Sequence, residues 1–155
     1  MKFFMRVAAT AALSLGLVMV PQSAGAADPV SANAENLRKL DIMLMVTSLR
    51  CRGGPDNFQP DYLAFSKAHV GTLRRAANYL TADFTRRQGS TGAKRALDKM
   101  SVSMANSYGV GHPWLGCAEL KQVTRDLAGE RDVTRLSDSA NELLASRPMG
   151  YWAAR

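Results

Sequence analysis

The spacing of apolar residues predicts that this chain is all-α. Apolar positions recur at steps of three and four residues, as on one face of a helix, and alternating β-branched runs are missing from the sequence. The pattern predicts a bundle of four to five helices, which we place at residues 34–51, 60–87, 93–108, 113–129 and 132–147.

The first two predicted helices differ in how their apolar residues are arranged. In residues 34–51 the apolar positions extend almost all the way round, which is typical of a helix in the centre of a core. Residues 60–87 instead carry one narrow stripe, made up of Tyr62, Phe65, His69, Leu73, Ala76, Leu80 and Phe84. Turn-forming residues end both helices: Gly-Gly-Pro at 53–55 follows the first and Gly89 follows the second.

The N-terminus has the order of a secretory signal peptide. Lys2 and Arg6 precede an apolar run over residues 7–20, and Pro21 and several small residues lead to a cleavage site that we place after Ala26. The run is roughly 14 residues long, short of the ~20 needed to cross a bilayer, so an uncleaved anchor is the weaker alternative. We expect a bacterial protein of the periplasm or a secreted one, with no transmembrane segment after cleavage.

Cleavage divides the chain into four parts. We expect a signal peptide at residues 1–26, a polar leader at 27–33, one helical domain at 34–147 and a C-terminal tail at 148–155. A mature chain of about 129 residues is long enough to bury a core of its own. The sequence shows no internal repeat and no sign of a second domain.

Cys51 and Cys117 are the only cysteines of the chain. An even count in an oxidising compartment predicts one disulfide, which would join the first predicted helix to the fourth. The alternatives are two buried thiols, a metal site or a redox site, but the sequence has no C-x-x-C and no zinc-type spacing. The disulfide makes that end of the bundle the first place to look for a site.

Basic residues are concentrated in one stretch. The chain has a formal charge of +7. Residues 67–99 include eight basic residues and only two acidic ones. Four of the basic residues form two adjacent pairs, Arg74 with Arg75 and Arg86 with Arg87. We interpret these four as candidate contacts for an anionic partner, either a protein or a component of the cell envelope. The competing interpretation is a solvated helix exterior. Nucleic acid is not an expected partner, because no binding motif accompanies the charge.

The segment from residue 108 to 117 has the most unusual local composition. Three glycines, a proline, two aromatic residues, a histidine and Cys117 occur within it. Tyr108, His112 and Trp114 are candidate binding residues of a rigid recognition loop. The alternative is a tight connection between helices, with no binding role. The segment is not a dinucleotide-binding motif, because the third glycine and the preceding strand are both missing.

Catalytic and metal-binding motifs are hard to assemble from this sequence. There is no nucleophile elbow, and no pair of carboxylates at a spacing that glycoside hydrolysis would need. His69 lies on an apolar stripe, where a hydrogen-bonded core role is the usual one. Two histidines and several methionines at core positions do not make a metal site. We therefore expect no catalytic residues, no metal and no cofactor.

Several short segments of the mature chain resemble a group of small, secreted, uncharacterised bacterial proteins. These segments are LDIMLMVT at 40–47, LRCR at 49–52, DNFQ at 56–59 and GHPWLGC at 111–117. Proteins of this kind are sometimes labelled S-adenosyl-L-homocysteine hydrolase, but the residues here do not support that label, since the enzyme needs a nicotinamide-binding sheet domain. The plan of helices with one disulfide is also similar to periplasmic acid-stress chaperones of the HdeA type and to toxin-immunity proteins.

These observations predict a non-enzymatic protein that binds a protein or an envelope component outside the cytoplasm. An acid-stress chaperone or a toxin-immunity protein is the first alternative. A small envelope enzyme, or a protein like the mislabelled hydrolases, is the second.

Overall fold

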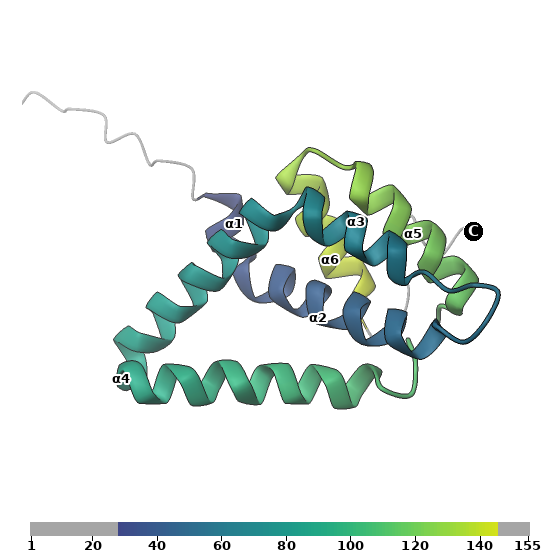
Figure 1. The fold of residues 1–155 in the computed structure, drawn as a ribbon. Coiled ribbons are helices and arrows are strands. Elements are labelled where there is room, and N and C mark those ends of the chain that lie inside the picture. Colours follow the sequence, from purple (N-terminus) through teal and green to yellow (C-terminus); the bar gives the residue numbers. More distant parts are fainter. Residues whose placement is uncertain (1–27, 146–155) are drawn as a thin grey trace, which may run out of the picture.

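The computed structural model describes residues 28–145, and this part of the chain contains helices and no strand (Figure 1). The expected signal peptide at 1–26 and the tail at 148–155 lie outside the described residues. The helices are α1 (Pro29–Ala32), α2 (Ala34–Cys51), α3 (Gln59–Ala68), α4 (Val70–Tyr108), α5 (Cys117–Gly129) and α6 (Val133–Leu143). The all-α prediction is confirmed, with six helices in the described part instead of four to five.

Helix α2 is the centre of the fold, as its apolar surface predicts. It packs against all the other helices, and Leu37, Leu40 and Leu44 are fully buried along it. Its apolar surface is not covered on every side, because Met45 is 38% exposed and Leu49 is 43% exposed. The predicted bounds of this helix, residues 34–51, agree with those of α2.

The predicted helix over residues 60–87 is wrong in one respect, because the chain bends at His69. The backbone there has φ −107° and ψ 12°, so α3 ends and α4 begins in a new direction. The side chain of His69 is buried, and its Nε2 lies 2.7 Å from the carbonyl oxygen of Leu127, near the end of α5. The bend lets α3 pack on α5 while α4 packs on α2.

Helix α4 has a kink at Gly89. The residue adopts φ 72° and ψ 172°, a conformation that is essentially restricted to glycine. The helix end that the sequence predicts at Gly89 is confirmed, although helix resumes at once instead of at residue 93. We call residues 70–88 the first arm and residues 90–108 the second arm. Figure 1 shows the two arms and α2 as three sides of a triangle.

The predicted disulfide is present and joins the last residue of α2 to the first residue of α5. The Cα atoms of Cys51 and Cys117 are 5.8 Å apart. Helix α5 begins at Cys117 and not at Pro113, because the chain from 109 to 116 remains a loop that contacts the end of α6. Within the expected polar leader, residues 29–32 form the short α1, where the Asp28 side chain accepts a hydrogen bond from Val30 N–H.

Candidate functional site

A cleft of about 570 Å³ lies between α2 and the two arms of α4. This volume is within the range of ~300–1,000 Å³ that is typical of small-molecule sites. The kink at Gly89 creates the cleft, because a straight α4 would carry its second arm away from α2. The cleft is lined by Glu35 and Lys39 from α2, Phe84 and Gln88 from the first arm, and Arg95, Ala96, Lys99, Met100, Ser103 and Met104 from the second arm.

One side of the cleft is apolar. Phe84 and Met100 are partly buried and pack against the main core, and Met104 is 8% exposed. They come from different arms, and only the reversal of direction at Gly89 brings them together. The core therefore continues into the wall of the cleft, and part of its apolar surface remains open to a ligand.

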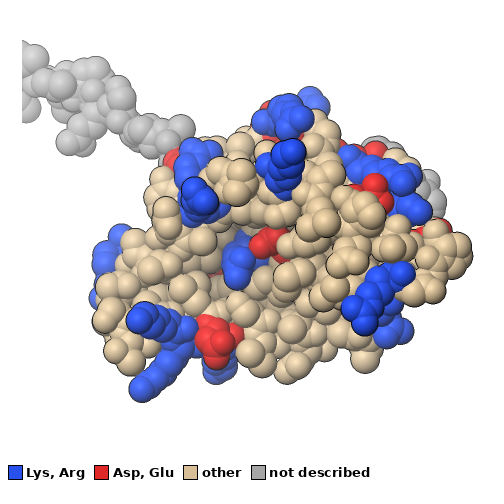
Figure 2. All heavy atoms as spheres, in the orientation of Figure 1, with Lys and Arg blue, Asp and Glu red and all other residues tan. Residues whose placement is uncertain are grey.

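The rim of the cleft is mainly cationic. Lys39 forms a salt bridge of 2.5 Å with Glu35, one turn earlier on α2. Arg95 and Lys99 are one turn apart on the second arm, and neither forms a salt bridge within the part of the chain that the structure describes. Figure 2 shows a hollow on this side of the molecule, with both basic and acidic atoms visible inside it.

Arg86 and Arg87, two of the predicted binding residues, lie at the kink beside the cleft. Both pair with Asp83 one turn earlier, and the Arg86–Asp83 distance is 3.0 Å. The Arg87 guanidinium also lies 4.9 Å from the centre of the Phe84 ring, whose side chain lines the cleft. These two arginines therefore flank the cleft and extend its positive charge along the first arm, without lining it.

Arg74 and Arg75, the other predicted pair, lie elsewhere. Both are exposed near the start of the first arm, about four turns before the kink. Here the Tyr79 hydroxyl donates a 2.7 Å hydrogen bond to Asp28 beside α1. That bond lowers the pKa of Asp28, with smaller contributions from the Val30 N–H and from the charge of Arg75. The structure does not bring this pair together with Arg86 and Arg87.

Tyr108, His112 and Trp114 do form one cluster, against the end of α6. The ring of His112 stacks on Tyr108 and meets Trp114 edge-on, with centroid distances of 5.6 and 4.7 Å. Its Nε2 lies 2.8 Å from the Leu143 carbonyl, and Trp114 Nε1–H donates to the Ala145 carbonyl at 3.1 Å. Carbonyls at a helix end have no partner within the helix, so these side chains satisfy them. This packing favours the structural interpretation of the loop.

Burial changes the acid–base behaviour of this cluster. It lowers the pKa of His112, and the hydrogen bond to Leu143 only partly opposes it. It also raises the pKa of Tyr108. With Nε2–H donating to Leu143, the Nδ1 atom is an acceptor, and it lies 3.5 Å from Trp114 N. The contact from Trp114 N to Nδ1 is a hydrogen bond only with a neutral His112 ring, whereas the bond to Leu143 can form with the protonated ring as well.

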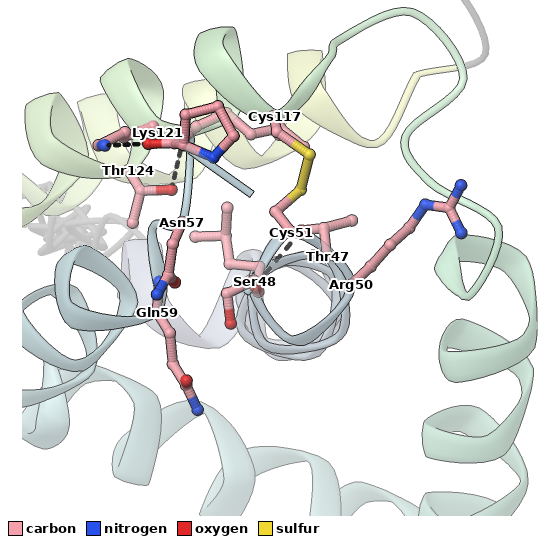
Figure 3. The surroundings of a disulfide bond; sticks show 12 residues. Thr47, Ser48, Arg50, Cys51, Asn57, Gln59, Cys117, Lys121 and Thr124 are labelled. Carbon is pink, nitrogen blue, oxygen red and sulfur yellow. Dashed lines mark hydrogen bonds between the residues drawn. A yellow bond between two sulfur atoms is a disulfide. The ribbon is translucent and has the colours of Figure 1, made fainter. Parts of the chain in front are cut away.

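The disulfide end has a smaller hollow than the kink. About 210 Å³ lies between Arg50, the residues from 53 to 56 and the two cysteines. Figure 3 shows Arg50 directed away from the disulfide, and its guanidinium lies 3.5 Å from the Gly109 carbonyl. Lys121 Nζ donates to the Pro55 carbonyl at 3.4 Å on the other side of the bond. These contacts tie the loops to the helices and leave a space below the usual size of a ligand site.

Asp41 is a partly buried carboxylate outside the cleft. It accepts hydrogen bonds from Tyr62 at 3.1 Å and from Arg38 at 3.0 Å. Burial raises the pKa of Asp41, and the two hydrogen bonds oppose this. Burial and the neighbouring carboxylate raise the pKa of Tyr62 to about 12. Asp41 does not line the cleft, so we assign it to the packing of α3 on α2.

Among residues 28–145 there is no group of three His, Cys, Asp or Glu side chains that could hold a metal ion. No helix in the same range is long and apolar enough to cross a membrane. Comparison with protein-family models, curated proteins and solved structures gives no match.

The cleft residues were not singled out by the sequence pattern, although part of the signal is there. Arg95 and Lys99 belong to the basic stretch, and Met100 and Met104 fall one turn apart on the inner row of the same helix. What the pattern does not show is the direction of the second arm. Only the conformation of Gly89 places these side chains opposite Phe84 and Lys39.

Proposed function

We propose that this protein is a non-enzymatic binding protein that works in the bacterial periplasm or outside the cell. Its ligand is an anionic, partly apolar component of the envelope, and the cleft between α2 and α4 binds it. The observation that carries this proposal is the combination of unpaired Arg95 and Lys99 with the open apolar surface of Phe84 and Met100 in one cavity.

The ionisable groups of the cleft favour binding over catalysis. Glu35 is the one carboxylate among the lining residues, and it is paired with Lys39. Among residues 28–145, no histidine, cysteine or second carboxylate lines the cleft. General acid–base and nucleophilic catalysis usually need such groups within hydrogen-bond reach of each other. Cations around an apolar wall instead suit a ligand that is held by charge and by contact area.

A location outside the cytoplasm is supported by the disulfide. Disulfides persist in oxidising compartments and are rare in a reducing cytoplasm. The basic–apolar–small order of the first 26 residues is typical of an exported protein. Both observations bear on where the protein meets its ligand, and an envelope component is available there.

Sedimentation with lipid vesicles tests the proposal. The mature protein is mixed with phosphatidylglycerol or phosphatidylcholine vesicles, and we expect it to pellet with the anionic vesicles only and to be released by high salt. The variant Arg95→Gln/Lys99→Gln should lose at least tenfold in affinity. Its matched control is Arg74→Gln/Arg75→Gln, which removes the same charge outside the cleft. Equal loss in both variants, or no preference for anionic vesicles, contradicts the proposal.

One observation favours a second candidate, an acid-stress chaperone. Burial lowers the pKa of His112, so charging its ring on acidification carries a desolvation cost and should destabilise the loop cluster against α6. The stabilising bond between Asp28 and Tyr79 is also lost when the carboxylate is protonated. Asp41 acts in the opposite direction, because protonation removes the cost of burying its charge. Apolar-dye fluorescence that stays flat from neutral pH to about pH 2 would rule this candidate out.

A further inference from the structure

We infer that the α2–α4 cleft binds one molecule of a long-chain fatty acid, with its carboxylate at Arg95 and Lys99 and its acyl chain against Phe84, Met100 and Met104. This inference rests on the proposed function and names the ligand of the same cleft. Size, apolar surface and unpaired charge each restrict the choice of ligand.

The volume of the cleft argues against a protein segment. An α-helix with its side chains is about 10 Å across, so 570 Å³ holds only about one turn of it. The cleft is also bounded on three sides, by α2 and by the two arms of α4. A docked helix needs a groove that is open at both ends. Neither restriction applies to a single flexible chain.

The apolar surface of the cleft suits an acyl chain. Met100 and Met104 lie one turn apart on the second arm, and Phe84 comes from the first arm. Methionine side chains are unbranched and adapt their shape to what they contact, so they can pack along a chain of methylenes. The Phe84 ring adds a flat apolar surface that does not depend on a particular ligand shape.

The charges of the cleft suit a carboxylate head. Arg95 and Lys99 are at i and i+4, so their side chains project from the same face of the second arm. A guanidinium can bind the two oxygens of a carboxylate with two parallel hydrogen bonds. Lys39 is already paired with Glu35, which leaves the second arm as the cationic side of the cleft. The Gln88 amide, also in the lining, supplies a further donor.

Other occupants of the cleft are less well matched. The chain after residue 145 carries Arg147 and Arg155 and no acidic residue, so it has the same charge sign as the rim. A second copy of this basic protein would likewise bring positive charge toward positive charge. A neutral lipid would leave Arg95 and Lys99 without a partner. A monoacyl phospholipid meets the charge requirement, and it therefore enters the test as a separate arm.

The test is a calorimetric titration of the mature protein with hexadecanoate below its aggregation concentration. We expect one molecule bound per protein. Hexadecanol, which has the same chain and a neutral head, should bind at least tenfold more weakly. Arg95→Gln/Lys99→Gln should lose at least tenfold for hexadecanoate, and Arg74→Gln/Arg75→Gln less than twofold. Met100→Asn should weaken binding of the acid and the alcohol alike. Helix content and thermal midpoint confirm that each variant folds.

Five outcomes overturn the inference. Equal binding of the acid and the alcohol would show that the charge of the head group does not contribute. Equal loss of affinity in the two double variants would show that the ligand does not bind in the cleft. Binding of lysophosphatidylglycerol without binding of hexadecanoate assigns the cleft to a phospholipid. If hexadecanoate fails while anionic vesicles still bind through Arg95 and Lys99, the inference fails and the proposed function stands. If the vesicles fail as well, both fall together.

Discussion

The two ends of this molecule are built in different ways. At the disulfide end, Cys51–Cys117 joins two helices covalently, and His112 and Trp114 bond the carbonyls of Leu143 and Ala145, at the end of α6 and just beyond it. At the kink end, the conformation of Gly89 sets the angle between the two arms of α4 around the cleft, and the exposed ion pairs of Asp83 lie within the first arm. The end with the strongest constraints has the smaller hollow. Constraint and ligand-sized space are therefore separate properties in this fold, and rigidity alone does not locate a site.

Removal of the disulfide should have the largest effect on stability. The bond closes a loop with a sequence separation of 66, so the chain-entropy model gives a loss of ~4 kcal/mol in the free energy of unfolding. Urea unfolding of Cys51→Ser/Cys117→Ser, compared with the oxidised protein, measures this loss. Reduced wild-type protein is the control, because it lacks the bond without a change of side chains.

The same variant sharpens the contrast between the two ends. The cleft does not include either cysteine, so a folded population of Cys51→Ser/Cys117→Ser should bind hexadecanoate within about twofold of wild type. A large loss of binding with intact helix content would show that the disulfide end shapes the cleft. The structure of the cleft would then depend on the disulfide end.

Substitution of the kink glycine should have the second largest effect. At φ 72° and ψ 172°, Gly89→Ala places a side chain in a conformation that costs ~1–3 kcal/mol. The protein then either keeps the kink and loses this stability, or straightens α4 and loses the cleft. Thermal unfolding and the hexadecanoate titration report the two effects separately.

Gly71→Ala is the matched control for Gly89→Ala. Gly71 lies in the first arm of the same helix, and a Cβ there meets nothing within 4 Å. Alanine is favoured over glycine in a helix by roughly 0.5–1 kcal/mol, so this variant should be slightly more stable than wild type and should bind normally. If Gly89→Ala behaves in the same way, the kink does not depend on glycine.

Acidification should weaken the disulfide end. Burial holds the pKa of His112 below its unfolded value, so its stabilising effect is present above about pH 6.5 and is lost as the pH falls below that. Tyr108, which stacks on it, does not titrate in this range. His112→Leu should lose ~1 kcal/mol at pH 7.5, the worth of one hydrogen bond, and the gap to wild type should narrow toward pH 5.

Urea unfolding at several pH values measures this gap. A gap of constant size would show that protonation of His112 is not linked to folding. His112→Gln is the control, because its amide can keep the bond to Leu143 and does not titrate. It should therefore remain close to wild type at pH 7.5 and exceed it at pH 5.

The sequence predicts the parts of this fold that depend on hydrophobic periodicity. It does not predict the direction in which one helix follows another. Leu37, Leu40 and Leu44 identify α2 and its place in the core, because burial follows a repeat of three and four residues. His69 looks like one more stripe residue, and it is buried as such. Its backbone bends because α3 packs on α5, a tertiary contact that no local pattern encodes.

The candidate site follows the same rule. The basic stretch and the unusual loop are visible in the sequence, and Tyr108, His112 and Trp114 do meet in space. The cleft depends instead on the angle between two arms that Gly89 sets. A glycine between two helical patterns marks a break, but the same residue permits many directions. Arg95 and Lys99 therefore look like other surface cations until the second arm is placed.

The smallest effect should come from the ion pairs at the kink end. Asp83 pairs with Arg86 and Arg87, but these side chains are 39%, 76% and 58% exposed, and exposed pairs contribute ~0–1 kcal/mol. Asp83→Asn should therefore change the free energy of unfolding by less than ~1 kcal/mol, and the difference should shrink in high salt. Urea unfolding at low and high ionic strength measures it. A loss above ~2 kcal/mol would mean that these ion pairs stabilise the first arm far more than exposed pairs usually do.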